Sequence, residues 1–264
     1  MYPSKFSYEA PETIDAAVAL LREARGEAKV LAGGQSLVPM MKLRFASPET
    51  LVDINNIPGL AYHGADPDGT YRIGALCRHV DLEKDGNLVS EQPTMAAAAP
   101  LIADPIVRTR GTLVGSLCHS DPQGDWASVM SALGGSIVAQ GPDGRRSIPC
   151  IDFTNGPFQN VLAFDEIAVE AFVPAPMGNR AGGYLKLERR VGDFATVGVA
   201  VSLEFSGGQV ARAGIGLTGV GPSTICADEA AEVLVGEDLN AASIDRAAAL
   251  AAEISQPRSD HRGS

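Results

Sequence analysis

The stretch from Lys29 to Arg44, KVLAGGQSLVPMMKLR, shapes the first part of the chain. Its short apolar run, Val30–Ala32, predicts a strand. The adjacent glycines Gly33 and Gly34 let the backbone turn sharply and approach a ligand without Cβ interference. Ser36 precedes helix-forming residues and is suited to cap a helix whose first N–H groups point outward. Such a turn can seat a phosphate, although many strand-to-helix turns contain glycine and bind nothing. The local pattern leaves both interpretations open.

The composition is that of a globular protein. The chain has 264 residues, 45% of them hydrophobic and 20% charged, enough for one large domain or two smaller ones. Its net charge of −11 argues against nucleic acid or an anionic membrane surface as a partner. No stretch approaches the roughly 20 apolar residues of a membrane span. The first residues lack the apolar core of a signal peptide, so the sequence predicts a cytoplasmic protein, either free or at the inner face of the membrane.

The cysteines and histidines show no metal-binding pattern. The four cysteines lie far apart without any C-x-x-C pair, which is a poor framework for a metal, an iron–sulfur cluster or disulfides. The four histidines show no zinc-ligand spacing. The sequence therefore predicts buried, reduced thiols and no metal site in this chain. The cysteines are Cys77, Cys118, Cys150 and Cys226.

Hydrophobic periodicity and turn signals divide the chain into three parts. Residues 1 to about 56 alternate helix and strand, which predicts a small α/β lobe with parallel pairing. Residues 57 to 176 contain hairpin signals and helices, which predicts a mixed α+β lobe. The Pro/Gly-rich link Pro174–Gly178 marks a boundary. From residue 177 we expect a smaller α+β domain with a three-stranded antiparallel sheet and helices. The predicted helices cover 11–26, 36–43, 79–85, 92–103, 227–235 and 241–254, and the predicted strands 29–32, 50–54, 61–63, 71–75, 136–140, 145–149, 167–173, 183–189, 196–205 and 209–217.

Two motifs have the residue pattern of known sites but lack the structural context that those sites need. Gly214-Ile-Gly216-Leu-Thr-Gly219 has the G-x-G-x-x-G spacing of a dinucleotide fingerprint, but Gly-Pro follows where a helix should begin. His119, Ser120 and Asp121 resemble a hydrolase triad, but three successive residues rarely converge their side chains. Neither motif predicts a site.

A second glycine-containing turn lies between Arg110 and Ser116, followed by Asp121, Pro122 and Asp125. It combines small polar groups with an acidic residue that enters a helix. One interpretation is a capped helix with Asp121 at the N-cap and Pro122 at the first helical position. A ligand contact is compatible with that cap, so both interpretations stay open.

The motifs together resemble the FAD-binding medium subunits of molybdenum hydroxylases, the xanthine dehydrogenase family, and most of all the carbon-monoxide-dehydrogenase type. LAGGQSLVPMMKLR, LIADPIVRTRGT, RRVGDFATVGVAV and GIGLTGVGPST resemble that subunit in the same order and at similar spacing. The resemblance implies an α+β fold: a two-lobed PCMH-type FAD-binding domain over residues 1–176 (lobes 1–56 and 57–176), then a C-terminal α+β domain over 177–264.

The resemblance also implies a cofactor site. Two turns, one from each lobe, would hold the FAD pyrophosphate through backbone N–H groups, which would explain how an acidic chain retains an anionic cofactor. The cation at Lys186 would lie near the flavin, where it can stabilise negative charge on the reduced ring. For Asp125 a helix cap, for Lys186 a solvated strand charge and for Phe194 a core aromatic are the alternatives. The implied cofactor-binding residues are Lys29, Ala32, Gly33, Gly34, Gln35, Ser36, Leu37, Ile102, Thr112, Leu113, Val114, Gly115, Ser116, Asp125, Ala168, Lys186 and Phe194, with no catalytic residue and no metal ligand among them.

Three features depart from the family pattern. Val114 stands where the family usually has a second glycine, so a side chain is expected where the backbone should approach the phosphate. Gln35 stands where similar members carry His. The chain ends at Arg262–Ser264, where members generally continue into a further helix, so the C-terminal domain is expected to be incomplete.

The resemblance implies an electron-transfer flavoprotein subunit. Its expected partners are a large subunit with a molybdenum–pterin cofactor and a small subunit with two [2Fe–2S] clusters, assembled as a dimer of heterotrimers. FAD in this chain would take electrons from the clusters and pass them to an external acceptor. Two alternatives remain: a self-contained flavin oxidoreductase of the same fold, and a non-catalytic interaction subunit that has lost FAD. The substrate of the complex and the acceptor cannot be named from this chain.

Overall fold

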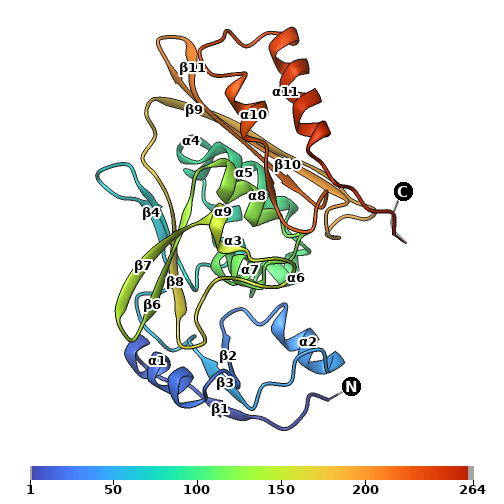
Figure 1. Ribbon diagram of the computed structural model, residues 1–264. Coiled ribbons are helices and arrows are strands. Elements are labelled where there is room, and N and C mark those ends of the chain that lie inside the picture. Colours follow the sequence, from blue (N-terminus) through green and yellow to red (C-terminus); the bar gives the residue numbers. More distant parts are fainter. Residues whose placement is uncertain (1, 261–264) are drawn as a thin grey trace.

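The computed structural model describes residues 2–260 and arranges them in three tiers (Figure 1). The lowest tier in Figure 1 is a three-stranded parallel sheet in the order β1-β3-β2 with two helices. Thr13 caps the first helix by accepting a hydrogen bond from Ala16 N–H. The expected alternation of helix and strand with parallel pairing is confirmed. Strand β1 was not predicted because all three of its residues are exposed and show no alternation. The elements are β1 (Ser7–Glu9), α1 (Ile14–Glu23), β2 (Ala28–Leu31), α2 (Leu37–Leu43) and β3 (Thr50–Asp53).

The middle tier contains a five-stranded antiparallel sheet in the order β4-β5-β8-β6-β7. Both predicted hairpins form, with the turns at 66–69 and 141–144. The sheet brings together strands that are up to a hundred residues apart in sequence, since β8 pairs with both β5 and β6. The strands are β4 (His63–Ala65), β5 (Tyr71–Gly74), β6 (Ser136–Gly141), β7 (Gly144–Pro149) and β8 (Ile167–Val173).

The helices of the middle tier pack beside this sheet around Trp126, which is fully buried. The single helix predicted for 92–103 is wrong: Pro93 begins a new helix and Pro100 lies in a 3₁₀ turn, so the segment is broken. The interpretation of Asp121 and Pro122 as a helix start is also wrong, because the helix begins at Asp125 with Gly124 at the N-cap. The helices are α3 (His79–Lys84), α4 (Leu88–Glu91), α5 (Pro93–Ala98), η1 (Ala99–Leu101), α6 (Pro105–Arg108), α7 (Leu113–His119), α8 (Asp125–Ala132) and α9 (Cys150–Phe153).

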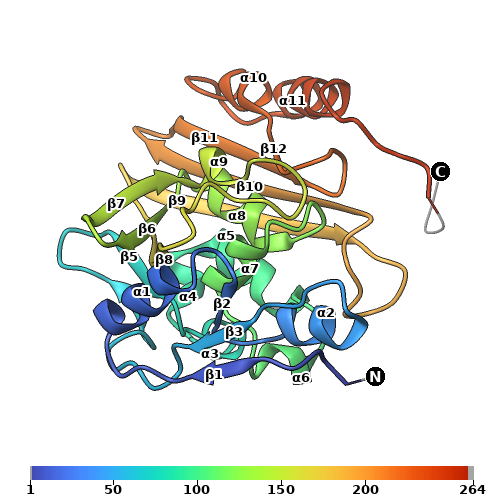
Figure 2. The same ribbon diagram turned by 60° about the horizontal axis from the view of Figure 1, so that its bottom comes forward.

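The upper tier is a sheet of four antiparallel strands in the order β12-β11-β10-β9, and not of three as expected. The missed strand, β12, has two residues, too few to show a period. Figure 2 shows α10 and α11 on the outer face of this sheet, while its inner face packs on α5 and α8. The elements are β9 (Asn179–Leu187), β10 (Val197–Ser206), β11 (Gln209–Thr218), β12 (Ile225–Cys226), α10 (Asp228–Glu232) and α11 (Ala241–Glu253).

The glycines of the G-x-G-x-x-G motif serve this packing. Gly214 and Gly216 lie within β11. A Cβ on either one would collide with the backbone of α8, at Ala132 and at Ser128 respectively. The motif therefore lets a helix and a strand approach closely, and no helix begins within it, as the sequence analysis expected.

Candidate functional site

The two glycine-containing turns, about 80 residues apart in sequence, meet in the structure. A Cβ on Gly33 would lie 2.8 Å from the Cα of Gly111 and closer still to the carbonyl oxygen of Arg110. Gly33 therefore permits backbone-to-backbone contact between the lowest and middle tiers. Gly34 has a φ of +75°, a left-handed conformation that favours glycine. A close contact between the two tiers thus accounts for Gly33, and the left-handed backbone conformation accounts for Gly34.

Polar side chains tie the two turns together. Asn55 donates from Nδ2 to the carbonyl oxygen of Ala32 at 2.8 Å. Arg78 donates to Asn55 Oδ1 and to the carbonyl oxygen of Arg110, each at 2.5 Å. Because Arg78 contacts both tiers, it fixes the first turn against the second. Burial and the neighbouring Arg110 lower the pKa of Arg78.

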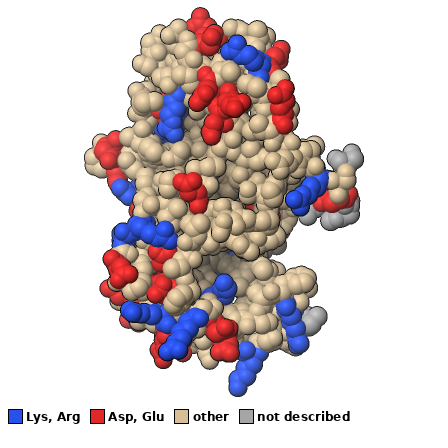
Figure 3. Space-filling view, in the orientation of Figure 1, with Lys and Arg blue, Asp and Glu red and all other residues tan. Residues whose placement is uncertain are grey.

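A cavity of about 630 Å³ opens beside these turns, a volume in the range of small-molecule and cofactor sites. Figure 3 shows the hollow between the lowest and middle tiers. The structure places fifteen of the seventeen predicted site residues on its wall, whereas Leu113 is fully buried in the core and Lys186 lies behind the wall. The fifteen are Lys29, Ala32, Gly33, Gly34, Gln35, Ser36, Leu37, Ile102, Thr112, Val114, Gly115, Ser116, Asp125, Ala168 and Phe194.

The first turn has backbone N–H groups that are free to donate hydrogen bonds to a ligand. The backbone N–H groups of residues 33–36 donate no hydrogen bond to any residue between 2 and 260. Ser36 occupies the N-cap position of α2, but its side chain makes no capping bond. Lys29 borders the same cavity, and Lys42 and Arg110 border a smaller cavity of about 370 Å³ against the same turn. The turn is therefore an electropositive place in an acidic chain.

The second turn is the capped start of a helix. The Thr112 side chain accepts a hydrogen bond from Gly115 N–H at 3.1 Å at the beginning of α7. A Cβ on Gly115 would lie 2.5 Å from that hydroxyl oxygen. The side chain expected at Val114 is only 2% exposed and belongs to the hydrophobic core. The cavity has its volume with Val114 in place, so this departure from the family pattern does not close it.

At the cavity wall, Asp125 is the centre of a buried polar cluster. Tyr184 donates to Asp125 Oδ1 at 2.5 Å, and Lys186 donates to Oδ2 at 3.1 Å and to the carbonyl oxygen of Leu101 at 2.9 Å. The Lys186 side chain is 1% exposed and also lies 3.4 Å from Glu188. The alternatives of a helix cap for Asp125 and a solvated charge for Lys186 are therefore wrong. Burial raises the pKa of Asp125, and the Lys186 ammonium opposes that rise.

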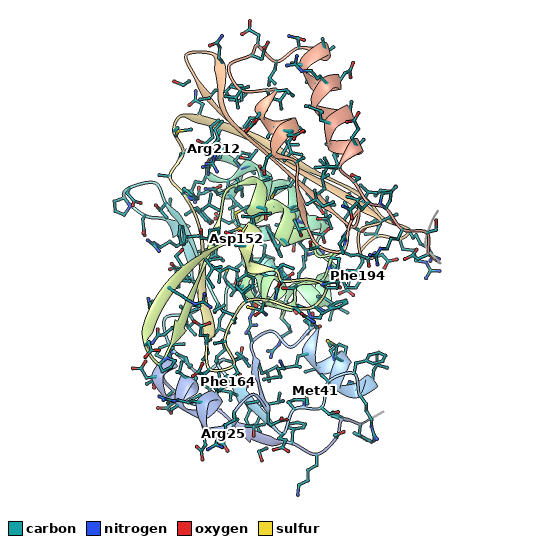
Figure 4. All side chains as sticks on the ribbon, viewed as in Figure 1. Arg25, Met41, Asp152, Phe164, Phe194 and Arg212 are labelled. Carbon is teal, nitrogen blue, oxygen red and sulfur yellow. The ribbon has the colours of Figure 1, made fainter. Side chains whose placement is uncertain are left out.

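Several residues on the cavity wall were not predicted from the sequence. Phe194, which was predicted, is half exposed and lies on the loop before β10. Phe164, which was not, borders the cavity beside the lowest tier (Figure 4). Phe158 has a φ of +59° and its ring packs on His119. His79, which is 4% exposed, also borders the cavity. Since the chain brings these residues together only through its tertiary fold, no local motif could single them out.

Known proteins share this arrangement over the full length of the chain. The family described as "FAD binding domain in molybdopterin dehydrogenase" matches residues 4–176, and "CO dehydrogenase flavoprotein C-terminal domain" matches residues 183–264. The chain belongs to this family of FAD-binding medium subunits. It is an oxidoreductase subunit of the carbon-monoxide-dehydrogenase-like type, and the expected resemblance is confirmed.

Individual relatives agree with this family. The carbon monoxide dehydrogenase medium chain of Hydrogenophaga pseudoflava is 41% identical over 264 residues, covering 100% of this chain and 91% of the relative. The glyceraldehyde dehydrogenase medium chain of Sulfolobus acidocaldarius is 34% identical over 264 residues, covering 100% of this chain and 93% of the relative. A solved carbon monoxide dehydrogenase from Hydrogenophaga pseudoflava superposes with a TM-score of 0.95 at 42% identity, covering 100% of this chain and 92% of that one. Quinoline 2-oxidoreductase from Pseudomonas putida superposes with a TM-score of 0.91 at 32% sequence identity, covering 100% of this chain and 91% of that one.

Proposed function

We propose that this medium subunit holds FAD in the 630 Å³ cavity and transfers electrons between iron–sulfur clusters of a partner and an external acceptor. The observation that carries the proposal is the meeting of two turns, one from each tier, at a single cavity. One turn presents unpaired N–H groups at Gly33–Ser36, and the other begins a helix at Thr112. Backbone donors of this kind suit a pyrophosphate.

The residues present fit the cofactor. Gly33 and Gly34 leave no side chain over the first turn, and the side chain of Val114 is accommodated in the core. On the wall of the same cavity, Asp125 would offer a buried carboxylate to polar groups of the cofactor. When bound, FAD supplies the ability to exchange electrons singly or in pairs. The two turns would hold its phosphates, while the half-exposed ring of Phe194 would border the flavin.

Lys186 acts in this proposal through Asp125. Its ammonium does not reach the cavity wall, but its 3.1 Å contact favours the charged form of the Asp125 carboxylate and orients it. The ammonium comes from β9 of the upper tier and Asp125 from α8 of the middle tier. Through this contact the upper tier supports a wall residue of the FAD site.

The partners in this proposal carry the remaining cofactors. We place a molybdenum–pterin cofactor on a large subunit and two [2Fe–2S] clusters on a small one, in a dimer of heterotrimers in the cytoplasm. Residues 1–176 would bind FAD as two lobes, and residues 177–264 would form the C-terminal domain. Relatives named medium chains match over the full chain, which supports this assignment. No helix between residues 2 and 260 is long and apolar enough to cross a membrane.

Cofactor analysis of the purified chain tests the proposal. We expect a flavin absorption spectrum and, after denaturation, FAD at about one equivalent per chain by chromatography. A chain that stays colourless after incubation with FAD would contradict it and favour an interaction subunit without FAD. Reduction of the bound flavin by a small substrate, without partner chains, would instead favour a self-contained flavin oxidoreductase.

A further inference from the structure

His79 is a buried wall residue that the expected site did not include. It is the first residue of α3, and its backbone N–H donates to the carbonyl oxygen of Gly111 at 2.9 Å. Its side chain is 96% enclosed and borders the cavity. A Cβ on Gly111 would lie 2.8 Å from His79 Nε2. The imidazole therefore lies directly against the second turn.

A buried tryptophan fixes which ring nitrogen carries the proton. The indole Nε1 of Trp126 lies 3.0 Å from His79 Nδ1, and both side chains are buried. An indole N–H can donate but cannot accept. Nδ1 must therefore be the bare, accepting nitrogen, and in the neutral ring the proton is on Nε2. No residue between 2 and 260 accepts a hydrogen bond from that Nε2–H.

The surroundings also keep the ring neutral. Burial, together with the nearby cations Arg108 and Arg78, lowers the pKa of His79 to about 4. A second proton would have to bind Nδ1, where it would displace the indole N–H. The ring is therefore a fixed donor that carries no charge.

We propose that His79 is a neutral positioning donor for the bound cofactor, offering Nε2–H to an acceptor oxygen of FAD where the Gly111 turn borders the cavity. The proposal rests on the function proposed above and adds to it a residue outside the two backbone turns. It also gives the Trp126–His79 hydrogen bond a purpose beyond packing: the indole selects the tautomer that places a donor at the cavity.

Three full-length variants test the donor. His79→Phe removes both ring nitrogens and keeps a planar aromatic ring, and His79→Gln can accept from Trp126 and still donate to the cavity. Gly86→Ala is the matched control, because its added Cβ meets nothing within 4 Å. A hydrogen bond to a charged acceptor predicts an FAD dissociation constant about ten- to a hundredfold higher in His79→Phe. We expect His79→Gln to stay within about threefold of wild type. A folded His79→Phe that binds FAD like wild type overturns the proposal.

Nitrogen-15 NMR of histidine-labelled wild type provides a second measurement if His79→Phe does not fold. The His79 signal, assigned by its loss in His79→Gln, is expected to show the Nε2–H tautomer at pH 7 and to move on addition of FAD. An Nδ1–H tautomer, or a signal unmoved by bound FAD, overturns the proposal. If the wild-type chain binds no FAD at all, the proposed function itself is refuted. Binding by wild type with equal binding by His79→Phe refutes only the role of His79.

Discussion

Replacing Gly33 by alanine tests the contact on which the whole site depends. Gly33 does not have a left-handed φ, so an alanine there suffers no backbone strain and its cost is purely steric. The new methyl group would lie 2.8 Å from the Cα of Gly111 and closer to the carbonyl oxygen of Arg110. Both are backbone atoms, which cannot rotate away as a flexible side chain could. The two tiers must therefore separate by several tenths of an ångström.

The expected magnitude follows from overpacking. Inserting a methyl group into a close contact costs about 1–3 kcal/mol, so we expect the free energy of unfolding of Gly33→Ala, measured by urea denaturation, to fall by about that amount. FAD affinity, measured by quenching of flavin fluorescence, should fall at least tenfold because the two turns no longer hold their spacing. Gly86→Ala, with no neighbour within 4 Å, should be neutral or about 0.4–1 kcal/mol more stable. Equal behaviour of the two variants in both assays would refute this reasoning.

Three further predictions concern buried polar groups. Lys186→Met leaves the Asp125 carboxylate buried without its cation, which should cost about 3–5 kcal/mol of unfolding free energy. Adding Asp125→Asn to Lys186→Met should recover part of this loss. A Lys186→Met variant as stable as wild type would contradict the importance of the Lys186–Asp125 ion pair. Thr112→Ala removes the α7 cap and should cost about 1 kcal/mol, seen as a lower urea midpoint. Because the pKa of His79 falls from 6.5 to about 4 on folding, the unfolded chain binds more protons between these values. The contribution of His79 to stability should therefore be constant above pH 6.5 and fall by about 3 kcal/mol as the pH drops to 4, and His79→Gln should remove that contribution.

Local patterns were sufficient to predict most of the secondary structure. The strand–glycine–helix order at Lys29–Arg44 needs only local information, because a short apolar run, paired glycines and helix formers follow one another within sixteen residues. The same holds for β8 (Ile167–Val173), whose predicted and observed bounds agree. The errors lie where local signals are weak. Exposed β1 and two-residue β12 gain their structure from pairing with other strands, and two prolines divide the segment after Gln92.

The site was predicted mainly through the family resemblance, and the structure shows what that route omits. It implied that Lys186 lies near the flavin, which stays a prediction, but it did not reveal that the Lys186 ammonium contacts the Asp125 carboxylate at 3.1 Å. It treated Val114 as an obstruction, because a sequence does not reveal that this side chain turns into the core. It also passed over His79, whose importance depends on Trp126, 47 residues away. In each case the missing information was the direction of a side chain, which tertiary packing alone determines.

The resulting site explains how a chain with a net charge of −11 can hold a cofactor with two phosphate charges. A cluster of cations could do so, but among the described residues Lys29 is the only lysine or arginine on the wall of the main cavity, and it shares that wall with Asp104, Asp125, Glu166 and Asp193. The donors at the turns are instead uncharged: the N–H groups at Gly33–Ser36 and, in our proposal, the imidazole of His79. Uncharged donors held in place by the fold need no counter-ion and lose little on binding, since they are already oriented. The specificity of such a site depends on the rigidity of its two turns, which is why the contact at Gly33, rather than any single charge, should be its most sensitive point.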